Sequence, residues 1–231
     1  MPESSGALGI LGGTFDPPHI AHLRLAIEAR EALQLTEVVL VPAGSPPLRD
    51  APQASPAQRL AMVECAIADM PGYSVDASEM MVSGPSYTVA TLARLRKQHG
   101  TRPLVLLMGA DAFARLSAWQ RWRELFALAH IGVATRPGHA LLPQKVGAND
   151  TAQSAPDAEL TAEFSQRQGD AADIAHTPAG RIIPFAITPL EISATLIRQR
   201  LAQGLSVRHL VSSSVLDYID SHAIYRTPHG H

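Results

Sequence analysis

The fold is decided by the stretch Gly12-Gly13-Thr14-Phe15-Asp16-Pro17-Pro18-His19-Ile20-Ala21-His22. A short apolar run over 7–11 precedes it, and a helical pattern over 23–33 follows it. The stretch is therefore predicted to be a turn from a strand into a helix. Glycines let the backbone approach a ligand closely, and a helix N-terminus presents unpaired N–H groups that suit phosphate. We expect a phosphate-binding turn.

Two histidines in this turn are the first candidates for chemistry. His19 and His22 lie three residues apart, so both rings can face one ligand. Imidazole donates hydrogen bonds and can carry charge near neutral pH, which favours phosphate. Zinc would need a third and usually a fourth ligand, and a capping or core role is the other alternative. Asp16 is interpreted as a structural turn residue, and Thr14 either offers its N–H and hydroxyl to phosphate or shapes the turn.

The composition restricts the class of protein. The chain has 231 residues, 46% of them hydrophobic, which is enough for a sizeable core. The net charge of -2 argues against a general nucleic-acid or membrane-surface binder. The one cysteine, Cys65, cannot form an internal disulfide, and the first residues lack the pattern of a signal peptide. Without an apolar stretch of membrane-spanning length, the prediction is a cytoplasmic protein that binds neither nucleic acid nor membrane.

Strands and helices are predicted to alternate along the chain. After the first strand, strands are expected at 38–41, 73–76, 104–108, 131–135 and 181–185. Helices are expected at 23–33, 56–67 and 86–99, over a Trp-bearing segment that follows Asp111 and runs through Trp119 and Trp122, near 158–168, from 192, and from a capping box at Ser214 to His222. This alternation predicts an α/β fold: a Rossmann-like, doubly wound, mainly parallel sheet with helices on both faces and a C-terminal helical segment. Pro184 suggests that the last strand lies at an edge.

One domain over residues 1–231 is predicted. The ends, 1–6 and 227–231, are expected to be flexible, and 188–226 is expected to be the C-terminal helical part. Residues 139–180 are rich in Ala, Gln, Asp and Pro, which indicates a variable surface insertion holding one short helix.

Further polar residues follow the other predicted strands. Ligands of such sheets bind beyond the carboxyl ends of the strands, so these residues are expected to share one site. Arg49 and Arg136 either clamp an anionic substrate or are solvated surface residues. Asp111 follows Gly109 and either accepts from ribose hydroxyls or caps a helix. Trp119 either stacks on a flat ring or packs in the core.

A second motif, Ser193-Ala194-Thr195-Leu196-Ile197-Arg198, opens a predicted helix. Ser193 and Thr195 place hydroxyls at the helix start, and Arg198 lies three residues after Thr195 on the same face. Two hydroxyls, a helix N-terminus and an arginine suit a polyphosphate. The alternative is ordinary helix capping beside a solvated arginine. Neither a Gly-x-Ser-x-Gly elbow nor a P-loop occurs in the sequence, so acyl transfer and P-loop chemistry are not expected.

These strings together resemble a known family. Gly12 to His22 resembles the GGTFDPxHxGH motif of the nucleotidyltransferase superfamily, and Ile192 to Arg198 resembles its ISxTxIR motif. With 41–47, 85–88, 109–111, Trp119 and 136–138, the chain resembles the bacterial nicotinate-nucleotide adenylyltransferases over roughly residues 7–226.

The resemblance implies transfer of AMP from ATP to nicotinate mononucleotide, giving deamido-NAD and pyrophosphate in NAD biosynthesis, with Mg²⁺ carried by the ATP phosphates and no metal held by protein side chains. Holding two nucleotides in line can supply about 7–11 kcal/mol of the barrier. The catalytic groups implied are His19, His22 and Arg198. The ATP-binding residues implied are Gly12, Gly13, Thr14, Phe15, Gly109, Asp111, Ser193 and Thr195. The mononucleotide-binding residues implied are Arg49, Thr88, Trp119 and Arg136.

The sequence departs from the family pattern at three positions. Ala21 replaces a glycine, Leu48 stands where a histidine often precedes the arginine, and Gln120 stands where an aromatic residue is common. The last two make the mononucleotide side the less regular part of the predicted site.

Other functions stay open at this point. The first is a related nucleotidyltransferase that uses nicotinamide mononucleotide or another phosphorylated acceptor, such as phosphopantetheine. The second is a fragment of a class I aminoacyl-tRNA synthetase, because 19–22 resembles its HIGH signature. The third is a non-catalytic nucleotide sensor. The oligomeric state is open between monomer and homodimer.

Overall fold

The structure is a computed structural model that describes residues 6–45, 51–82, 84–135 and 158–226. In that part of the chain six strands form one parallel sheet in the order β3-β2-β1-β4-β5-β6. The strands are β1 (Leu8–Gly13), β2 (Glu37–Pro42), β3 (Tyr73–Val75), β4 (Leu104–Gly109), β5 (His130–Thr135) and β6 (Ile182–Ala186). The order runs outward in two directions from the middle, which confirms the predicted doubly wound fold.

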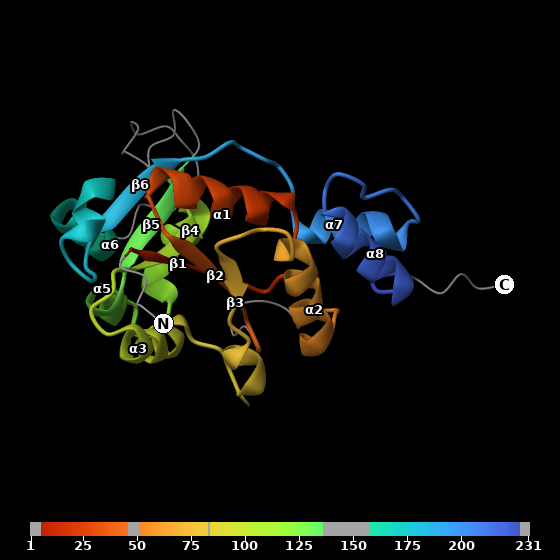
Figure 1. Cartoon of the computed structure of the whole chain (residues 1–231), viewed down its shortest axis with the longest axis horizontal. Helices are drawn as coiled ribbons and strands as arrows, with labels where there is room; N and C mark the ends of the chain where they lie inside the picture. Colours follow the sequence, from red (N-terminus) through yellow and green to blue (C-terminus); the bar gives the residue numbers. More distant parts are fainter. Residues whose placement is uncertain (1–5, 46–50, 83, 136–157, 227–231) are drawn as a thin grey trace. The chain divides into compact units, whose positions relative to one another are not determined.

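The chain divides into two compact units, whose helices and strands are labelled in Figure 1. The first unit is Met1–Ile10, Glu28–Thr36 and Tyr87–Pro189, and the second is Leu11–Ile27, Glu37–Ser86 and Leu190–His231. Strand β1 and helix α1 (Ile20–Ala32) each contribute residues to both units. The single domain expected from the sequence stays a prediction.

The first unit is built on β4, β5 and β6. The strands β4 and β5 read as continuous apolar runs and are buried over nearly their whole length, as expected for parallel strands covered on both faces. Helices α3 (Thr88–His99), α5 (Leu125–Leu128) and α6 (Ala158–Arg167) belong to this unit. Pro184 pairs with Val133 in β6, the edge strand, so the predicted edge position is confirmed.

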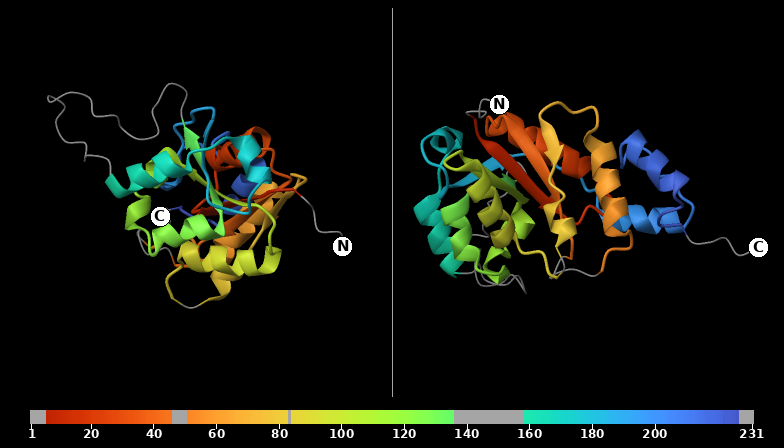
Figure 2. Two further views of the ribbon diagram at one scale, coloured as in Figure 1. Left: turned by 90° about the vertical axis from the view of Figure 1, so that its left-hand side faces the viewer. Right: turned by 60° about the horizontal axis from the view of Figure 1, so that its bottom comes forward.

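The second unit contains β2, β3 and helices α2 (Pro56–Ile67), α7 (Ala194–Ala202) and α8 (Ser213–Ser221). Helix α2 begins at the predicted Ser55-Pro56 start, where Ser55 and Gln58 form a complete capping box. Helix α8 lies beside α2, and the Ser214 hydroxyl donates to the Cys65 carbonyl oxygen at 2.8 Å (Figure 2). Buried apolar side chains of α2, α7 and α8 form its helical core: Met62, Val63, Ile197, Val215 and Ile219.

Two predicted helix starts are wrong, and both errors concern serine. Helix α3 begins at Thr88 and not at Ser86, because the Ser86 hydroxyl accepts the backbone N–H groups of Gly44 and Ser45. Helix α8 is capped by Ser212 and not by Ser214, which is used instead to bind Cys65. A serine hydroxyl bonds equally well to a helix end or to a distant backbone group, so sequence spacing does not separate the two.

The Trp-bearing segment was predicted to be helical, and it is a series of short pieces. These are α4 (Ala110–Phe113), η2 (Leu116–Ala118), η3 (Trp122–Glu124) and α5. Arg121 has φ 53°, in the left-handed region, which interrupts the helical path.

The predicted insertion is described only in part. The short helix expected near 158–168 is present as α6, and a further 3₁₀ helix, η4 (Ala171–Ala175), follows it. Residues 139–157 and 227–231 lie outside the described residues, as does most of 1–6. Among the described residues no helix is long and apolar enough to span a membrane.

Candidate active site

The turn after β1 is shaped by a buried aromatic ring. Phe15 is 1% exposed and has φ 51°, a backbone conformation that non-glycine residues seldom adopt. A Cβ added to Gly13 would lie 2.9 Å from the Phe15 ring, so glycine is required there for packing. A Cβ added to Gly12 would meet no described atom within 4 Å. Packing among the described residues therefore does not explain Gly12, whereas close approach of a ligand would.

The two histidines of the turn are stacked. The centroids of the His19 and His22 rings are 3.7 Å apart. The centroids of the Phe15 and His22 rings are 5.0 Å apart, and these two rings meet edge to face. The backbone N–H of His19 donates to Nδ1 of His22 at 3.2 Å. A neutral His22 therefore carries its proton on Nε2 and can donate from that atom. The two rings thus lie together, while the prediction that both face one ligand stays a prediction.

His19 is held as a neutral ring. It is 7% exposed, and its Nδ1 has no hydrogen-bond partner among the described residues. Burial lowers the pKa of His19 from 6.5 to about 4, and only a backbone hydrogen bond opposes this shift. A bound anion would act in the opposite direction and raise this pKa.

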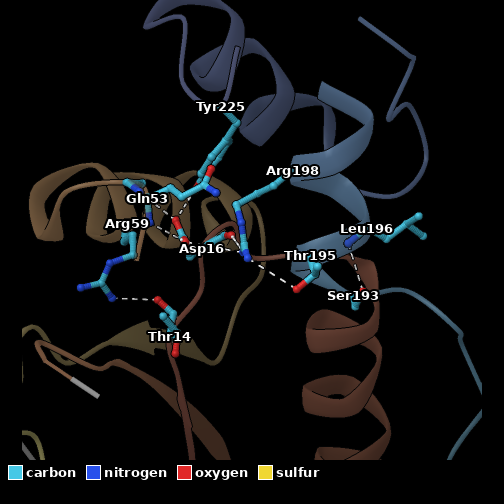
Figure 3. A network of polar contacts seen from close by, with 10 residues as sticks. Thr14, Asp16, Gln53, Arg59, Ser193, Thr195, Leu196, Arg198 and Tyr225 are labelled. Atoms are coloured by element: carbon cyan, nitrogen blue, oxygen red, sulfur yellow. Dashed lines mark hydrogen bonds and ion pairs between the residues drawn. The ribbon is translucent and has the colours of Figure 1, made fainter. Parts of the chain in front are cut away.

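Asp16 is the centre of a network of polar contacts in the second unit (Figure 3). Its Oδ1 accepts from the Ala54 N–H at 3.0 Å and from the Tyr225 hydroxyl at 2.7 Å. Its Oδ2 accepts from the Gln53 N–H at 2.9 Å and lies 3.6 Å from Nη1 of Arg198. The predicted structural role of Asp16 is confirmed, and this role includes the arginine of the second motif.

Arg198 is anchored through one end of its guanidinium. Nη1 donates to the main-chain oxygen of Asp16 at 2.8 Å, and Nη2 reaches Thr195 Oγ1 at 3.5 Å (Figure 3). Nε is buried without a partner among the described residues. The edge formed by Nε and Nη2 therefore holds only one long contact, and its outer atom, Nη2, can donate further hydrogen bonds to a phosphate.

The hydroxyls of the second motif take two different roles. Ser193 Oγ caps α7 by accepting from the Leu196 N–H at 3.2 Å, so the capping alternative holds for this residue. Thr195 is exposed and touches Arg198. The alternative of a solvated Arg198 is wrong, since its side chain is only 22% exposed.

Arg59 is a residue that the sequence interpretation missed. It is 1% exposed, and its guanidinium donates to main-chain oxygens of Thr14 (2.8 Å), Ala43 (2.6 Å) and Gly44 (3.0 Å). It thereby joins the turn after β1 to the loop after β2. A signal was available: Arg59 stands at i-3 and i-4 to the buried Met62 and Val63, on the apolar face of α2.

The first unit holds other predicted site residues. Gly109 precedes α4 at the end of β4, and a Cβ added there would meet no described atom within 4 Å. Asp111 is exposed, and the described residues form no hydrogen bond with its carboxylate. Trp119 is half-buried after η2, and Thr88 begins α3. These residues are described within the first unit alone.

Arg49 and Arg136 lie outside the described residues, as does the departure at Leu48. Among the described residues no group of three or more His, Cys, Asp or Glu side chains is arranged to hold a metal ion.

Comparison with known proteins identifies the family. A model of cytidylyltransferase-like proteins matches residues 10–200. A protein of Dechloromonas aromatica (strain RCB), named probable nicotinate-nucleotide adenylyltransferase, is 50% identical over 224 residues, which cover 96% of this chain and 99% of the relative. The chain belongs to the nicotinate-nucleotide adenylyltransferase family. A member of this family from Halorhodospira halophila (strain DSM 244 / SL1) is 45% identical over 93% of both chains.

Solved structures of similar fold carry the same family name. The Plasmodium falciparum nicotinic acid mononucleotide adenylyltransferase complexed with NaAD has a TM-score of 0.63 at 15% identity, covering 95% of this chain and 97% of its own. A nicotinate-nucleotide adenylyltransferase from Vibrio parahaemolyticus, designated putative, has a TM-score of 0.59 at 14% identity, covering 95% of both chains. At these identities the likeness shows the fold, and it agrees with the nucleotidyltransferase family found from sequence.

Proposed function

We propose that this protein transfers AMP from ATP to nicotinate mononucleotide, producing deamido-NAD and pyrophosphate. The observation that carries the proposal is the arrangement around one turn of the second unit. This turn holds the stacked His19 and His22, and its Asp16 anchors Arg198. A stacked pair of histidine rings, together with an arginine whose Nη2 holds only one long contact, suits a polyphosphate that gains charge during transfer. The 50% identical relative with the same family name supports the choice of substrates.

The reaction needs no covalent enzyme intermediate. A phosphate oxygen of the mononucleotide attacks the α-phosphorus of ATP, and the new P–O bond forms as the bond to pyrophosphate breaks. Such transfers depend on positioning and on stabilising charge. We assign these tasks to His22, as a donor from Nε2, and to His19 and Arg198. Ser193 and Thr195 lie at the start of α7, where N–H groups favour the leaving pyrophosphate.

The remaining substrate contacts are proposed from the family motifs. Gly109 and Asp111 would bind the adenosine ribose, and Thr88 and Trp119 the pyridine ring. Arg49 and Arg136 would hold the mononucleotide phosphate. Mg²⁺ would enter with ATP, since this ion is usually bound through substrate phosphates. The cytoplasmic location stays a prediction, and the oligomeric state stays open between monomer and homodimer.

One assay tests the function. Purified protein, ATP and Mg²⁺ are mixed separately with nicotinate mononucleotide, nicotinamide mononucleotide and phosphopantetheine, and the products are separated by chromatography. We expect deamido-NAD and pyrophosphate in equal amounts from the first mixture. If another acceptor is turned over faster, that acceptor replaces nicotinate mononucleotide as the proposed substrate. If the protein binds ATP but forms no product, it is a nucleotide sensor.

A further inference from the structure

Tyr225 lies far along the chain from the turn after β1, yet it bonds directly to that turn. Its hydroxyl donates to Asp16 Oδ1 at 2.7 Å, across a sequence separation of 209 residues (Figure 3). The segment that carries it is held in place after α8: Ile224 is 6% exposed and donates its N–H to the Ile219 carbonyl at 3.1 Å. Tyr225 itself has φ 62°, in the left-handed region. A tyrosine is rarely found in this conformation, so the surrounding contacts hold the residue there.

The bond from Tyr225 completes the shell around the Asp16 carboxylate. Oδ1 receives Tyr225 and the Ala54 N–H, while Oδ2 receives the Gln53 N–H and faces Arg198. Three hydrogen-bond donors and one ion pair thus fix both the position and the rotation of one buried carboxylate. Without the tyrosine hydroxyl, Oδ1 keeps a single donor, and the carboxylate can turn away from Arg198.

Arg198 depends on Asp16 for its orientation. Nη1 bonds to the main-chain oxygen of Asp16 and lies near its carboxylate, while Nη2 has only the 3.5 Å contact with Thr195. A planar guanidinium that is fixed at Nη1 presents its Nε and Nη2 edge in one direction. Movement of the carboxylate would therefore change where that edge points.

We propose that Tyr225 is a positioning residue for the adenylyl transfer, acting through Asp16 to fix the phosphate-binding edge of Arg198; this rests on the function proposed above. Tyr225 does not act as an acid. Its hydroxyl hydrogen is committed to Asp16, and burial, together with that hydrogen bond, raises its pKa well above the ordinary value. The tyrosine therefore stays protonated and keeps its bond to Asp16 throughout the working pH range.

Removal of one hydroxyl tests the proposal. Tyr225→Phe keeps the ring and removes only the donor, so we expect kcat to fall about tenfold, while KM for ATP changes less than about threefold. Tyr218→Phe is the matched control: this residue lies on α8 with its ring stacked on His222 at 4.1 Å, outside the network, and its variant should keep the parent kcat. A Tyr225→Phe variant with the parent kcat would overturn the proposal, even if its melting temperature were lower.

A double-mutant cycle shows whether the effect passes through Arg198. In the background of Arg198→Lys, which has no planar edge to orient, adding Tyr225→Phe should lower kcat less than twofold further. An equal tenfold loss in both backgrounds would place the effect of Tyr225 elsewhere and contradict the proposal.

A rescue variant separates positioning from folding. Replacement of Tyr225 by 4-aminophenylalanine restores an N–H donor at the same place and should return kcat to within about threefold of the parent. Circular dichroism confirms folding, and a variant that is unfolded at the assay temperature is measured with the parent at a lower one. If the 4-aminophenylalanine variant does not regain kcat, the proposal is overturned. If the parent protein makes no deamido-NAD, the proposed function is overturned. If the parent is active but Tyr225→Phe keeps its kcat, only the role of Tyr225 is overturned, so the two failures are distinct.

Discussion

The turn after β1 in the second unit and the turn after β4 in the first unit both lead from a strand into a helix. In the first of them, Asp16 is 4% exposed, and its carboxylate accepts three hydrogen bonds and pairs with Arg198. In the other, Asp111 is exposed and unbonded among the described residues. Each preceding strand also carries, at or next to its last residue, a glycine where an added Cβ would meet no described atom within 4 Å: Gly12 in β1 and Gly109 in β4.

This difference agrees with the charge of the group that each turn is proposed to bind. The turn after β1 is proposed to bind a polyphosphate, and donors that are fixed before binding need not reorganise as charge develops. Fixing them requires a buried polar network, which is stabilising only when every member is bonded. The turn after β4 is proposed to bind a neutral ribose, for which one exposed carboxylate suffices. The comparison predicts that mutations after β1 affect folding and turnover, whereas mutations after β4 affect ground-state binding alone.

The largest expected effect is on stability, at Arg59. Arg59→Met should lower the free energy of unfolding by about 4 kcal/mol, because three main-chain oxygens lose a buried charged donor. Urea denaturation measures this change. The control is Arg115→Met, an exposed arginine of the first unit, which should change stability by less than about 0.5 kcal/mol. Similar values for the two variants would mean that the network does not stabilise the turn.

Arg59 also shows what sequence reasoning could and could not reach. The strands and helices were predictable because apolar runs and capping residues act locally, as Ser55-Pro56 at the start of α2 shows. The histidine pair and Arg198 were predictable from spacing and motif. The long-range partners were not: Tyr225 meets Asp16 across 209 residues, and no local pattern encodes that pairing. Ser86 and Ser214 were misread for the same reason, since each bonds to a distant loop or helix.

The second prediction concerns turnover at the turn after β1. His22→Ala should lower kcat about 100-fold, equivalent to about 2.7 kcal/mol, because a fixed donor is lost where charge develops. Binding of ATP, measured by calorimetry, should weaken less than about fivefold. His176→Ala, an exposed histidine of the first unit, serves as control and should keep the parent values. Equal losses in kcat and affinity would make His22 a ligand of the ground state only.

The third prediction uses pH to test the buried state of His19. Its folded pKa of about 4 lies below the ordinary value of 6.5, so the unfolded chain binds more protons between these values. The contribution of the neutral His19 ring to the free energy of unfolding is therefore fully present above pH 6.5, and it is lost as the pH falls towards about 4. From about pH 7 to about pH 5.5, His19 should contribute a loss of about 1 kcal/mol.

Urea denaturation at both pH values, on the parent and on His19→Gln, isolates this contribution. Between the two pH values, the free energy of unfolding of His19→Gln should decrease by about 1 kcal/mol less than that of the parent. Some pH dependence will remain, since burial also lowers the pKa of His130 in the first unit. An unchanged decrease in His19→Gln would mean that the His19 ring is protonated in the folded protein, contrary to its burial.

The smallest expected effect is at Asp111, and it tests the other half of the comparison. Asp111→Asn keeps one acceptor oxygen for a ribose hydroxyl and removes only the charge. We therefore expect KM for ATP to rise about threefold, or about 0.7 kcal/mol, with kcat unchanged. The melting temperature should stay the same, because no described residue depends on that carboxylate. A large fall in kcat or in stability would show that the turn after β4 is as firmly organised as the turn after β1, and the contrast between the two units would then disappear.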